Sequence, residues 1–194
     1  MARPALTERR KAQTRREIAE SALGLFVRHG YEAVSVEAIA EDAGVSLRTF
    51  YRYFSAKDEV LSPIITDGID EFAQHITRRP AAENLATAVQ LAYQEISPAV
   101  EPRSVQALIQ LLIDVPALQA RWLHDLRTIE TALVPIVRQR AQPPLTNDQA
   151  QLTAAAIVTG LRVALEQSTR GASPEPLTDT LGHALRYLRA GANL

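Results

Sequence analysis

The chain contains no cysteine among its 194 residues. This absence excludes disulfide bonds, zinc fingers, iron–sulfur ligation and catalysis by a cysteine nucleophile. The chain also lacks any apolar run that approaches the roughly 18 residues of a membrane-spanning helix, and its N-terminus has no apolar stretch of the signal-peptide type. We therefore expect a protein of the reducing cytoplasm without a membrane segment.

Catalytic motifs are missing as well. The sequence has no HExxH, GxSxG, Walker or GxGxxG pattern. His75, His124 and His183 are scattered, and each is interpreted as a surface histidine or an internally bonded one. Because an enzyme would need residues brought together only in three dimensions, we expect no enzymatic activity, no metal and no cofactor. Turnover of a bound ligand would contradict this expectation.

Charge is unevenly distributed along the chain. The net charge of −1 would by itself argue against a nucleic-acid partner. Residues 1–16, however, carry six basic side chains and one acidic side chain, a local charge of +5, whereas residues 62–194 carry 11 basic and 13 acidic side chains. Local charge density governs contact with phosphate groups. The N-terminal part is therefore the candidate for nucleic-acid binding.

Every periodic hydrophobic pattern has the helical repeat, and no alternating pattern of useful length predicts a strand. The sequence therefore predicts an all-α protein of about nine helices. In the first helix, Ile18, Ala22, Leu25 and Phe26 form a stripe that is expected to be buried, and Gly30 is a suitable residue just beyond its C-terminus. Residues 105–115 are apolar nearly all round, which predicts a helix that is buried on most sides.

The segment from Ser35 to Lys57 predicts two short helices around a glycine turn. Ser35 is expected to cap the first helix and Ser46 the second. Gly44 lies between them and can adopt a positive φ without steric cost.

The second of these helices has an unusual outer face. A helical wheel places Leu47, Phe50 and Phe54 together on the inner side. The outer side carries only guanidinium, hydroxyl and phenol groups, those of Arg48, Thr49, Arg52 and Tyr53, with Tyr51 near the boundary. Arginine can donate two hydrogen bonds to guanine, while hydroxyl and phenol groups bind phosphate oxygens. We interpret this helix as a DNA reader; the alternative is a solvated surface helix with partly internal tyrosines.

The run from Thr14 to Leu61 resembles the DNA-binding domain of the TetR family of bacterial transcriptional regulators. The motifs that carry the resemblance are TRREI, ALGLFVRHGY, IAEDAGVS and TFYRYFSAKDEVL. The resemblance implies an all-helical homodimer with a recognition helix in the major groove and a ligand pocket in the body.

The resemblance also assigns candidate DNA contacts by position. These are Ser35, Ser46, Leu47, Arg48, Thr49, Tyr51, Tyr53 and Lys57. For Leu47 this assignment conflicts with the helical wheel, which places its side chain in the core. Tyr31 and residues 14–16 are further candidates for phosphate contact. Because two heads on a twofold dimer meet two half-sites, the expected partner is double-stranded DNA with an inverted-repeat operator.

The C-terminal half is expected to form the dimer interface. The predicted eighth helix carries small residues between Ala154 and Ala164, which let another helix approach closely. Together with a leucine-rich ninth helix, it resembles the pair through which TetR-family subunits form a four-helix interface. An ordinary core contact within one chain is the alternative.

The body also supplies candidate ligand contacts, namely Phe72, Tyr93, Gln106, Gln110 and Trp122. Gln106 and Gln110 lie about one helical turn apart in an otherwise apolar helix, so their amides need partners. A ligand could supply these partners, and so could backbone groups or neighbouring side chains. Trp122 and Tyr93 lie on apolar stripes, which favours the core.

The pattern of the body, from PALQARW to ALRYLRAG, resembles the acyl-CoA-like ligand-binding body of some actinobacterial members of the family. This resemblance implies a bulky, partly apolar small-molecule effector.

The connection between head and body contains a proline. Residues 55–58 are expected to form a capping box that starts the fourth helix, which would place Pro63 about two turns inside it. Proline there would remove the hydrogen bond to the Glu59 carbonyl group and kink the helix near residues 59–63. We expect this kink to serve as a hinge that transmits effector binding.

The sequence thus predicts a DNA-binding head in residues 1–58, made of the N-terminal arm and three helices, and a six-helix body for ligand binding and dimerisation in residues 59–194. The predicted function is a repressor that binds its operator as a dimer and is released by a small, partly apolar effector. The alternatives are an effector-independent DNA-binding or adaptor protein of the same fold, and an activator.

Overall fold

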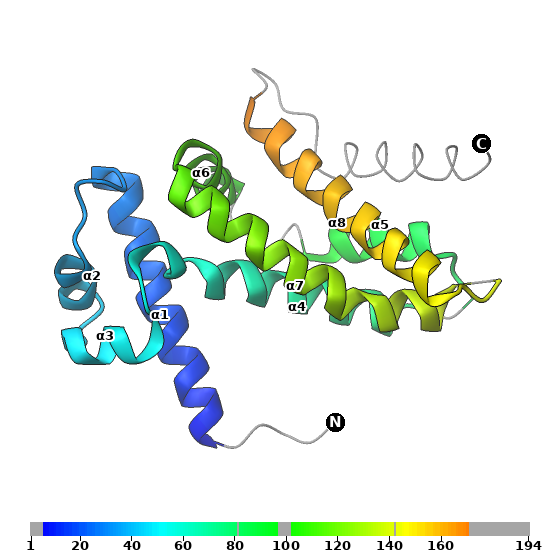
Figure 1. Cartoon of the computed structure of the whole chain (residues 1–194), viewed down its shortest axis with the longest axis horizontal. Helices are drawn as coiled ribbons and strands as arrows, with labels where there is room; N and C mark the ends of the chain where they lie inside the picture. Colours follow the sequence, from blue (N-terminus) through cyan, green and yellow to red (C-terminus); the bar gives the residue numbers. More distant parts are fainter. Residues whose placement is uncertain (1–5, 81, 97–101, 142, 171–194) are drawn as a thin grey trace. The chain divides into compact units, whose positions relative to one another are not determined.

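The computed structural model describes residues 6–80, 82–96, 102–141 and 143–170. Within these ranges the chain forms eight α-helices, one short 3-10 helix and no strand, so the predicted all-α class is confirmed (Figure 1). None of the described helices is both long enough and apolar enough to cross a membrane. The predicted ninth helix lies outside the described residues.

The chain divides into two compact units. Of the described residues, those up to Asp67 and Leu111–Trp122 form the first unit, and those of Gly68–Gln110 and from Leu123 onward form the second. The first unit therefore contains more than the predicted head of residues 1–58, and that domain boundary stays a prediction.

The first unit begins with α1 (Leu6–His29), which is helical through most of the predicted basic arm. Ile18, Ala22 and Phe26 are buried, as the apolar stripe predicts, whereas Leu25 is only half-buried. The helix ends at Gly30, which has a φ of 82° and donates a 2.9 Å backbone hydrogen bond to the Phe26 carbonyl group. Glycine adopts this left-handed conformation without the steric cost that a side chain brings.

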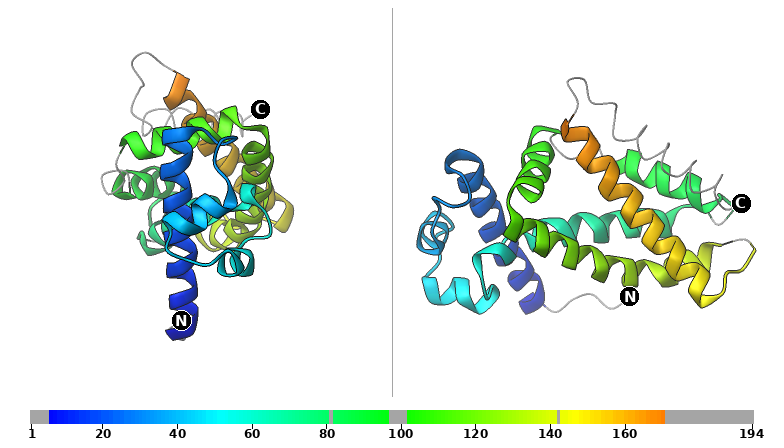
Figure 2. Two further views of the ribbon diagram at one scale, coloured as in Figure 1. Left: turned by 90° about the vertical axis from the view of Figure 1, so that its left-hand side faces the viewer. Right: turned by 45° about the horizontal axis from the view of Figure 1, so that its top comes forward.

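The helix-turn-helix follows as α2 (Val36–Asp42) and α3 (Leu47–Tyr53), and α2 packs against both α1 and α3 (Figures 1 and 2). The predicted caps are confirmed, because the Ser35 hydroxyl accepts a 3.1 Å hydrogen bond from the N–H of residue 38 and the Ser46 hydroxyl accepts one of 3.1 Å from that of residue 49. The glycine turn is confirmed as well, since Gly44 has a φ of 65°.

The predicted start of the fourth helix is wrong. Residues Lys57–Glu59 form the short 3-10 helix η1, and α4 (Ser62–Arg78) begins only afterwards. The Ser55 hydroxyl and N–H bond to Glu59, one residue beyond the expected partner in the capping box. Pro63 is thus the second residue of α4, a position at which a helix does not use the backbone N–H that proline lacks. The expected kink two turns inside the helix is therefore wrong, and the predicted hinge loses its structural basis.

The second unit contains α5 (Leu85–Ile96), α8 (Asn147–Arg170), and the greater parts of α4, α6 (Pro102–Asp114) and α7 (Pro116–Arg140). Apolar side chains from all five helices build its core, among them Phe72, Val89, Leu108, Leu133 and Ile157.

The prediction that residues 105–115 form a helix buried on most sides is wrong. Gln106, Gln110 and Asp114 are exposed along one face of α6, while Leu108 and Leu112 are buried. A helix that buries one stripe and exposes the opposite one is the ordinary surface arrangement. The two glutamine amides therefore do not lie in a dry interior.

Candidate nucleic-acid interface

The third helix is anchored from its inner side by two phenylalanines. Phe50 and Phe54 are buried, and their ring centroids lie 5.3 Å apart. Since α3 has only seven residues, too few to be stable alone in water, this packing and the Ser46 cap hold it in place. The anchoring leaves the opposite side of the helix facing outward.

Leu47 belongs to that outward side. Its side chain is 39% exposed, so its helical-wheel assignment to the core is wrong. Leu47 is the first residue of α3, and helical side chains lean toward the N-terminus. Its side chain therefore extends past the end of the helix, where the core does not cover it.

The other predicted DNA contacts on α3 lie at or near the surface. Arg48 and Tyr51 are exposed, the latter by 53%, while Thr49 and Tyr53 are half-buried. The Arg52 guanidinium lies 4.9 Å from the centre of the Tyr53 ring. No carboxylate among the described residues pairs with Arg48. The outer face of α3 is thus cationic and able to donate several hydrogen bonds.

The two predicted serine contacts already have structural roles. The Ser35 hydroxyl caps α2, and the Ser46 hydroxyl both caps α3 and shares a 2.9 Å hydrogen bond with the Thr49 hydroxyl. Both serines are exposed. A contact with phosphate would therefore add to the cap, and it stays a prediction for each of them.

Lys57 lies in η1 and turns toward the loop between α1 and α2. Its ammonium group donates hydrogen bonds to the carbonyl oxygens of Tyr31 at 2.9 Å and of Val34 at 3.0 Å. Tyr31 is buried, and burial is the main cause that raises the pKa of its phenol, ahead of the nearby charges of Asp58 and Glu32. These long-range contacts of Lys57 have no signal in the sequence.

The basic N-terminal segment is partly neutralised by its own helix. Lys11 pairs with Glu8 at 2.9 Å, and Arg16 pairs with Glu20 at 2.9 Å. Arg16 also reaches Asp67 at 3.4 Å. All of these side chains are about half exposed, so each pair contributes little to stability. The contact of residues 14–16 with phosphate stays a prediction.

The five predicted ligand contacts do not come together in one site. Phe72 and Trp122 are buried in the cores of different units, whereas Gln106 and Gln110 are exposed. Tyr93 is part of α5, but its side chain lies outside the description. The role of all five in ligand binding stays a prediction.

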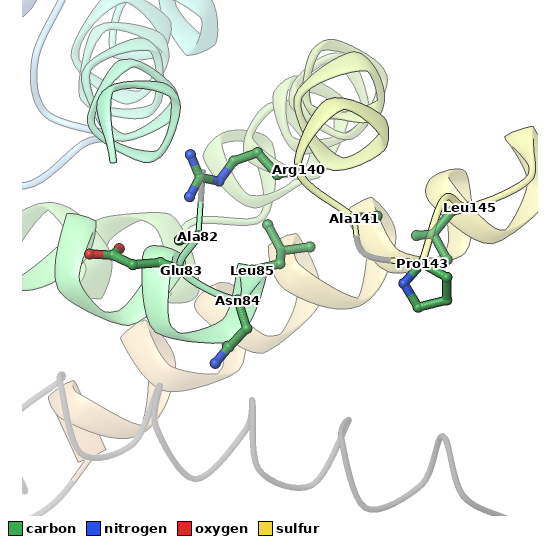
Figure 3. Close-up of a pocket in the computed structure, with 8 residues that line it drawn as sticks. All are labelled: Ala82, Glu83, Asn84, Leu85, Arg140, Ala141, Pro143 and Leu145. Atoms are coloured by element: carbon green, nitrogen blue, oxygen red, sulfur yellow. The ribbon is translucent and has the colours of Figure 1, made fainter. Parts of the chain in front are cut away.

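The second unit does contain a cleft that sequence reasoning missed (Figure 3). It has a volume of about 360 Å³ and lies between residues 82–85, which lead into α5, and a second group at and after the end of α7, namely Arg140, Ala141, Pro143 and Leu145. Arg140 lines it and is 9% exposed; its guanidinium donates to the carbonyl oxygens of Arg79 at 2.7 Å and Pro80 at 2.8 Å. None of the five predicted ligand contacts lines this cleft.

Arg79, whose carbonyl oxygen accepts a hydrogen bond from Arg140, also takes part in an ion-pair network. It pairs with Glu83 at 2.6 Å and with Glu95, which in turn shares a 2.8 Å hydrogen bond with His75. Hydrogen bonding to His75 is the main cause that lowers the pKa of Glu95, and that to Arg79 is the main cause that lowers the pKa of Glu83. Among the described residues, no group of three or more acidic or histidine side chains is placed to hold a metal ion.

Family models match both parts of the chain. The model described as bacterial regulatory proteins of the tetR family matches residues 18–63, and the MftR C-terminal domain matches residues 79–193. These two matches cover the helix-turn-helix and most of the remaining chain.

Named relatives are similar over most of the chain. The HTH-type transcriptional regulator TcmR of Streptomyces glaucescens is 34% identical over 155 residues, which are 75% of this chain and 68% of that protein. The putative mycofactocin biosynthesis transcriptional regulator MftR of Mycobacterium tuberculosis is 24% identical over 94% of this chain and 93% of its own. Among solved structures, Thermus thermophilus FadR, a TetR-family repressor in complex with lauroyl-CoA, superposes with a TM-score of 0.59 at 19% identity, over 91% of this chain and 94% of FadR.

Proposed function

Since this chain belongs to the TetR family of bacterial transcriptional regulators, we propose that it represses transcription by binding an inverted-repeat operator as a homodimer. A small, partly apolar effector bound by the body releases the dimer from the operator. The protein acts in the cytoplasm, where the operator is accessible.

The observation that carries this proposal is the outward face of α3. Arg48 and Tyr51 project from a helix that is capped at Ser46 and anchored by Phe50. An arginine on such a helix can read guanine in the major groove, and the tyrosine hydroxyl can bind a phosphate oxygen. The stretch from residue 46 to residue 56 contains no carboxylate that would repel the DNA backbone.

One face of α8 supports dimerisation through this helix and the predicted ninth helix, which lies outside the described residues. Leu152 is 72% exposed, and Ala156, Gly160 and Val163 are only half-buried at helical spacing along the same side. Small residues on such a face let a partner helix approach closely. Ala154, by contrast, is fully buried and belongs to the packing of the second unit itself.

For the effector, long-chain acyl compounds are the first class to test. FadR, which shares the fold, is a repressor solved with lauroyl-CoA. The sequence of the body also resembles acyl-CoA-like ligand-binding bodies. Lauroyl-CoA is therefore a suitable probe.

The test of the proposed function is selection of bound sequences from a pool of random duplex DNA at low salt, where phosphate contacts are strongest. We expect an enriched inverted repeat that the dimer binds and that lauroyl-CoA releases. No enrichment would refute the DNA-binding function. Enrichment of a site that no acyl compound releases would favour the effector-independent alternative, and a reporter gene under this operator distinguishes repression from activation.

A further inference from the structure

The unit that contains the helix-turn-helix also includes a distant part of the chain. Residues Leu111–Trp122, which are the end of α6 and the first turns of α7, cluster with the residues up to Asp67. A polar contact between these first turns of α7 and the segment after α3 would therefore relate the placement of these turns to that of the DNA reader within the same unit.

Arg121 makes such a contact. Its Nη1 donates a 3.0 Å hydrogen bond to Oε1 of Glu59, in η1, and its Nε donates one of 3.1 Å to the hydroxyl of Ser62, the first residue of α4. The side chains of Arg121 and Glu59 are 30% and 26% exposed. Partial burial weakens the competition from water, so this pair is stronger than a fully exposed one.

The second oxygen of Glu59 extends the contact to the recognition helix. Glu59 Oε2 accepts hydrogen bonds from the Ser55 N–H at 2.9 Å and from the Ser55 hydroxyl at 2.7 Å. Ser55 directly follows Phe54, which is the C-cap residue of α3 and is buried against Phe50. One carboxylate thus joins α7 to the residue that follows the end of the recognition helix.

The electrostatics of Glu59 agree with this geometry. The hydrogen bonds from the Ser55 hydroxyl and N–H are the leading causes that lower the pKa of the Glu59 carboxyl, and Arg121 lowers it further against the opposing effect of partial burial. The carboxylate is therefore ionised at neutral pH and accepts charge-assisted hydrogen bonds on both oxygens, which fixes its orientation more firmly than neutral ones would.

We propose that Arg121 is a positioning residue for DNA recognition: through Glu59 it fixes the C-terminal end of α3, so that operator affinity depends on the placement of the first turns of α7. Arg121 acts through Glu59 and Ser62 without touching DNA. This inference rests on the proposed function, because operator affinity is one of its two readouts.

The test compares full-length variants on the selected operator. Arg121→Gln and Glu59→Gln each remove the ion pair while keeping most of the side-chain volume, and Arg121→Lys keeps the charge but loses the planar fork. Arg127→Gln is the matched control, because Arg127 is an exposed arginine on the same helix. Affinity is measured well below the unfolding temperature of each variant, so that a purely structural role would leave it unchanged.

We expect Arg121→Gln to weaken operator affinity about tenfold, the effect of losing one charge-assisted contact. The operator affinity of Arg121→Lys should lie between those of Arg121→Gln and the wild type, and the affinity of Arg127→Gln should equal that of the wild type. The double variant Arg121→Gln/Glu59→Gln should be no weaker than the worse single variant, because residues of one network are not additive. The slope of log operator affinity against log salt concentration should be the same in Arg121→Gln as in the wild type, since no phosphate contact is lost.

Hydrogen exchange of the DNA-free protein provides the second readout. We expect Arg121→Gln to speed exchange at residues 54 and 55 while residues 36–42 of α2 keep their protection. If Arg121→Gln does not fold, Ser55→Ala removes one of the two Ser55 bonds and should show a smaller effect of the same kind.

Unchanged exchange at residues 54 and 55, or an affinity of Arg121→Gln within about twofold of the wild type, about the scatter expected of a neutral surface change, would overturn the proposal. If the wild type bound no DNA, the proposed function would fail, and hydrogen exchange would still decide whether Arg121 holds the end of α3.

Discussion

The ammonium group of Lys57 lies 4.0 Å from the centre of the Tyr31 ring and donates a 2.9 Å hydrogen bond to the carbonyl oxygen of the same residue. A second bond, to the Val34 carbonyl group, completes this attachment of η1 to the loop between α1 and α2. The resemblance to the TetR family assigns Lys57 to DNA. The geometry gives it a structural role within the unit that contains the helix-turn-helix.

We therefore expect Lys57→Gln to lower the free energy of unfolding by about 2 kcal/mol, because two hydrogen bonds from a charged donor and a cation–π contact are lost. Urea denaturation measures this change. The control is Lys11→Gln, at the only other lysine of the chain, which forms an exposed pair with Glu8 and should change stability by less than about 0.5 kcal/mol.

The salt dependence of operator binding separates the two roles of Lys57. A structural lysine leaves the slope of log affinity against log salt unchanged, whereas a lost phosphate contact reduces it by about one. A reduced slope in Lys57→Gln would contradict the structural role.

Of the side chains on α3, we expect that of Arg48 to contribute most to the recognition of the DNA sequence. Replacing Arg48 by alanine should weaken operator binding by about 1–3 kcal/mol and relax the preference for one base pair, as the loss of a bidentate guanine contact does. Competition between the selected operator and single-base variants measures both effects. Arg138→Ala, at an exposed arginine on α7, should bind like the wild type; equal losses in the two variants would indicate a general charge effect.

Replacing Gly44 and Gly68 by alanine should change the free energy of unfolding in opposite directions. Neither Gly44 nor Gly68 has a neighbouring atom within 4 Å of where a Cβ would lie, but only Gly44 has a positive φ, of 65°. We expect Gly44→Ala to cost about 1–2 kcal/mol through backbone strain. Gly68→Ala, within α4, should add about 0.5–1 kcal/mol through higher helix propensity. Thermal or urea unfolding measures both, and destabilisation by Gly68→Ala would contradict this explanation.

Glu59 should make stability depend on pH in the acid range. Its pKa in the folded chain lies below the ordinary value of 4.5, mainly because of the Ser55 hydrogen bonds. A lowered pKa stabilises the fold above the unfolded-state pKa, and this contribution is lost as the pH falls through the folded-state value. The free energy of unfolding should therefore fall less steeply below about pH 4.5 in Glu59→Gln than in the wild type. Parallel curves for the two proteins would contradict this prediction.

The local parts of the DNA reader follow from the sequence. The Ser35 and Ser46 hydroxyls each accept a hydrogen bond from the N–H group three residues further on. Gly44 adopts the positive φ of the turn because it has no side chain. Interactions within one helical turn have fixed spacing, so residue types at that spacing predict them directly.

The prediction for the fourth helix failed although it used the same rules. The sequence offers Ser55 and Asp58 as a capping box, but Glu59 accepts the Ser55 bonds instead and also bonds to Arg121, 62 residues further along the chain. The contact with Arg121 favours Glu59 as the partner of Ser55, because the Glu59 carboxylate reaches both Ser55 and Arg121. Tertiary contact therefore overrides the local rule, and α4 starts later than expected.

The sequence by itself determined the all-α fold and the helix-turn-helix with its caps and turn, because each depends on periodicity or on groups within a few residues, and the motifs of residues 14–61 indicated the family by resemblance. Only the tertiary structure decided that Leu47 is exposed, that Lys57 bonds to carbonyl groups 23 and 26 residues away, and that Arg121 lies against Glu59. Such contacts join segments whose separation along the chain is arbitrary, so no repeat or propensity in the sequence encodes them, and they form only when the helices pack.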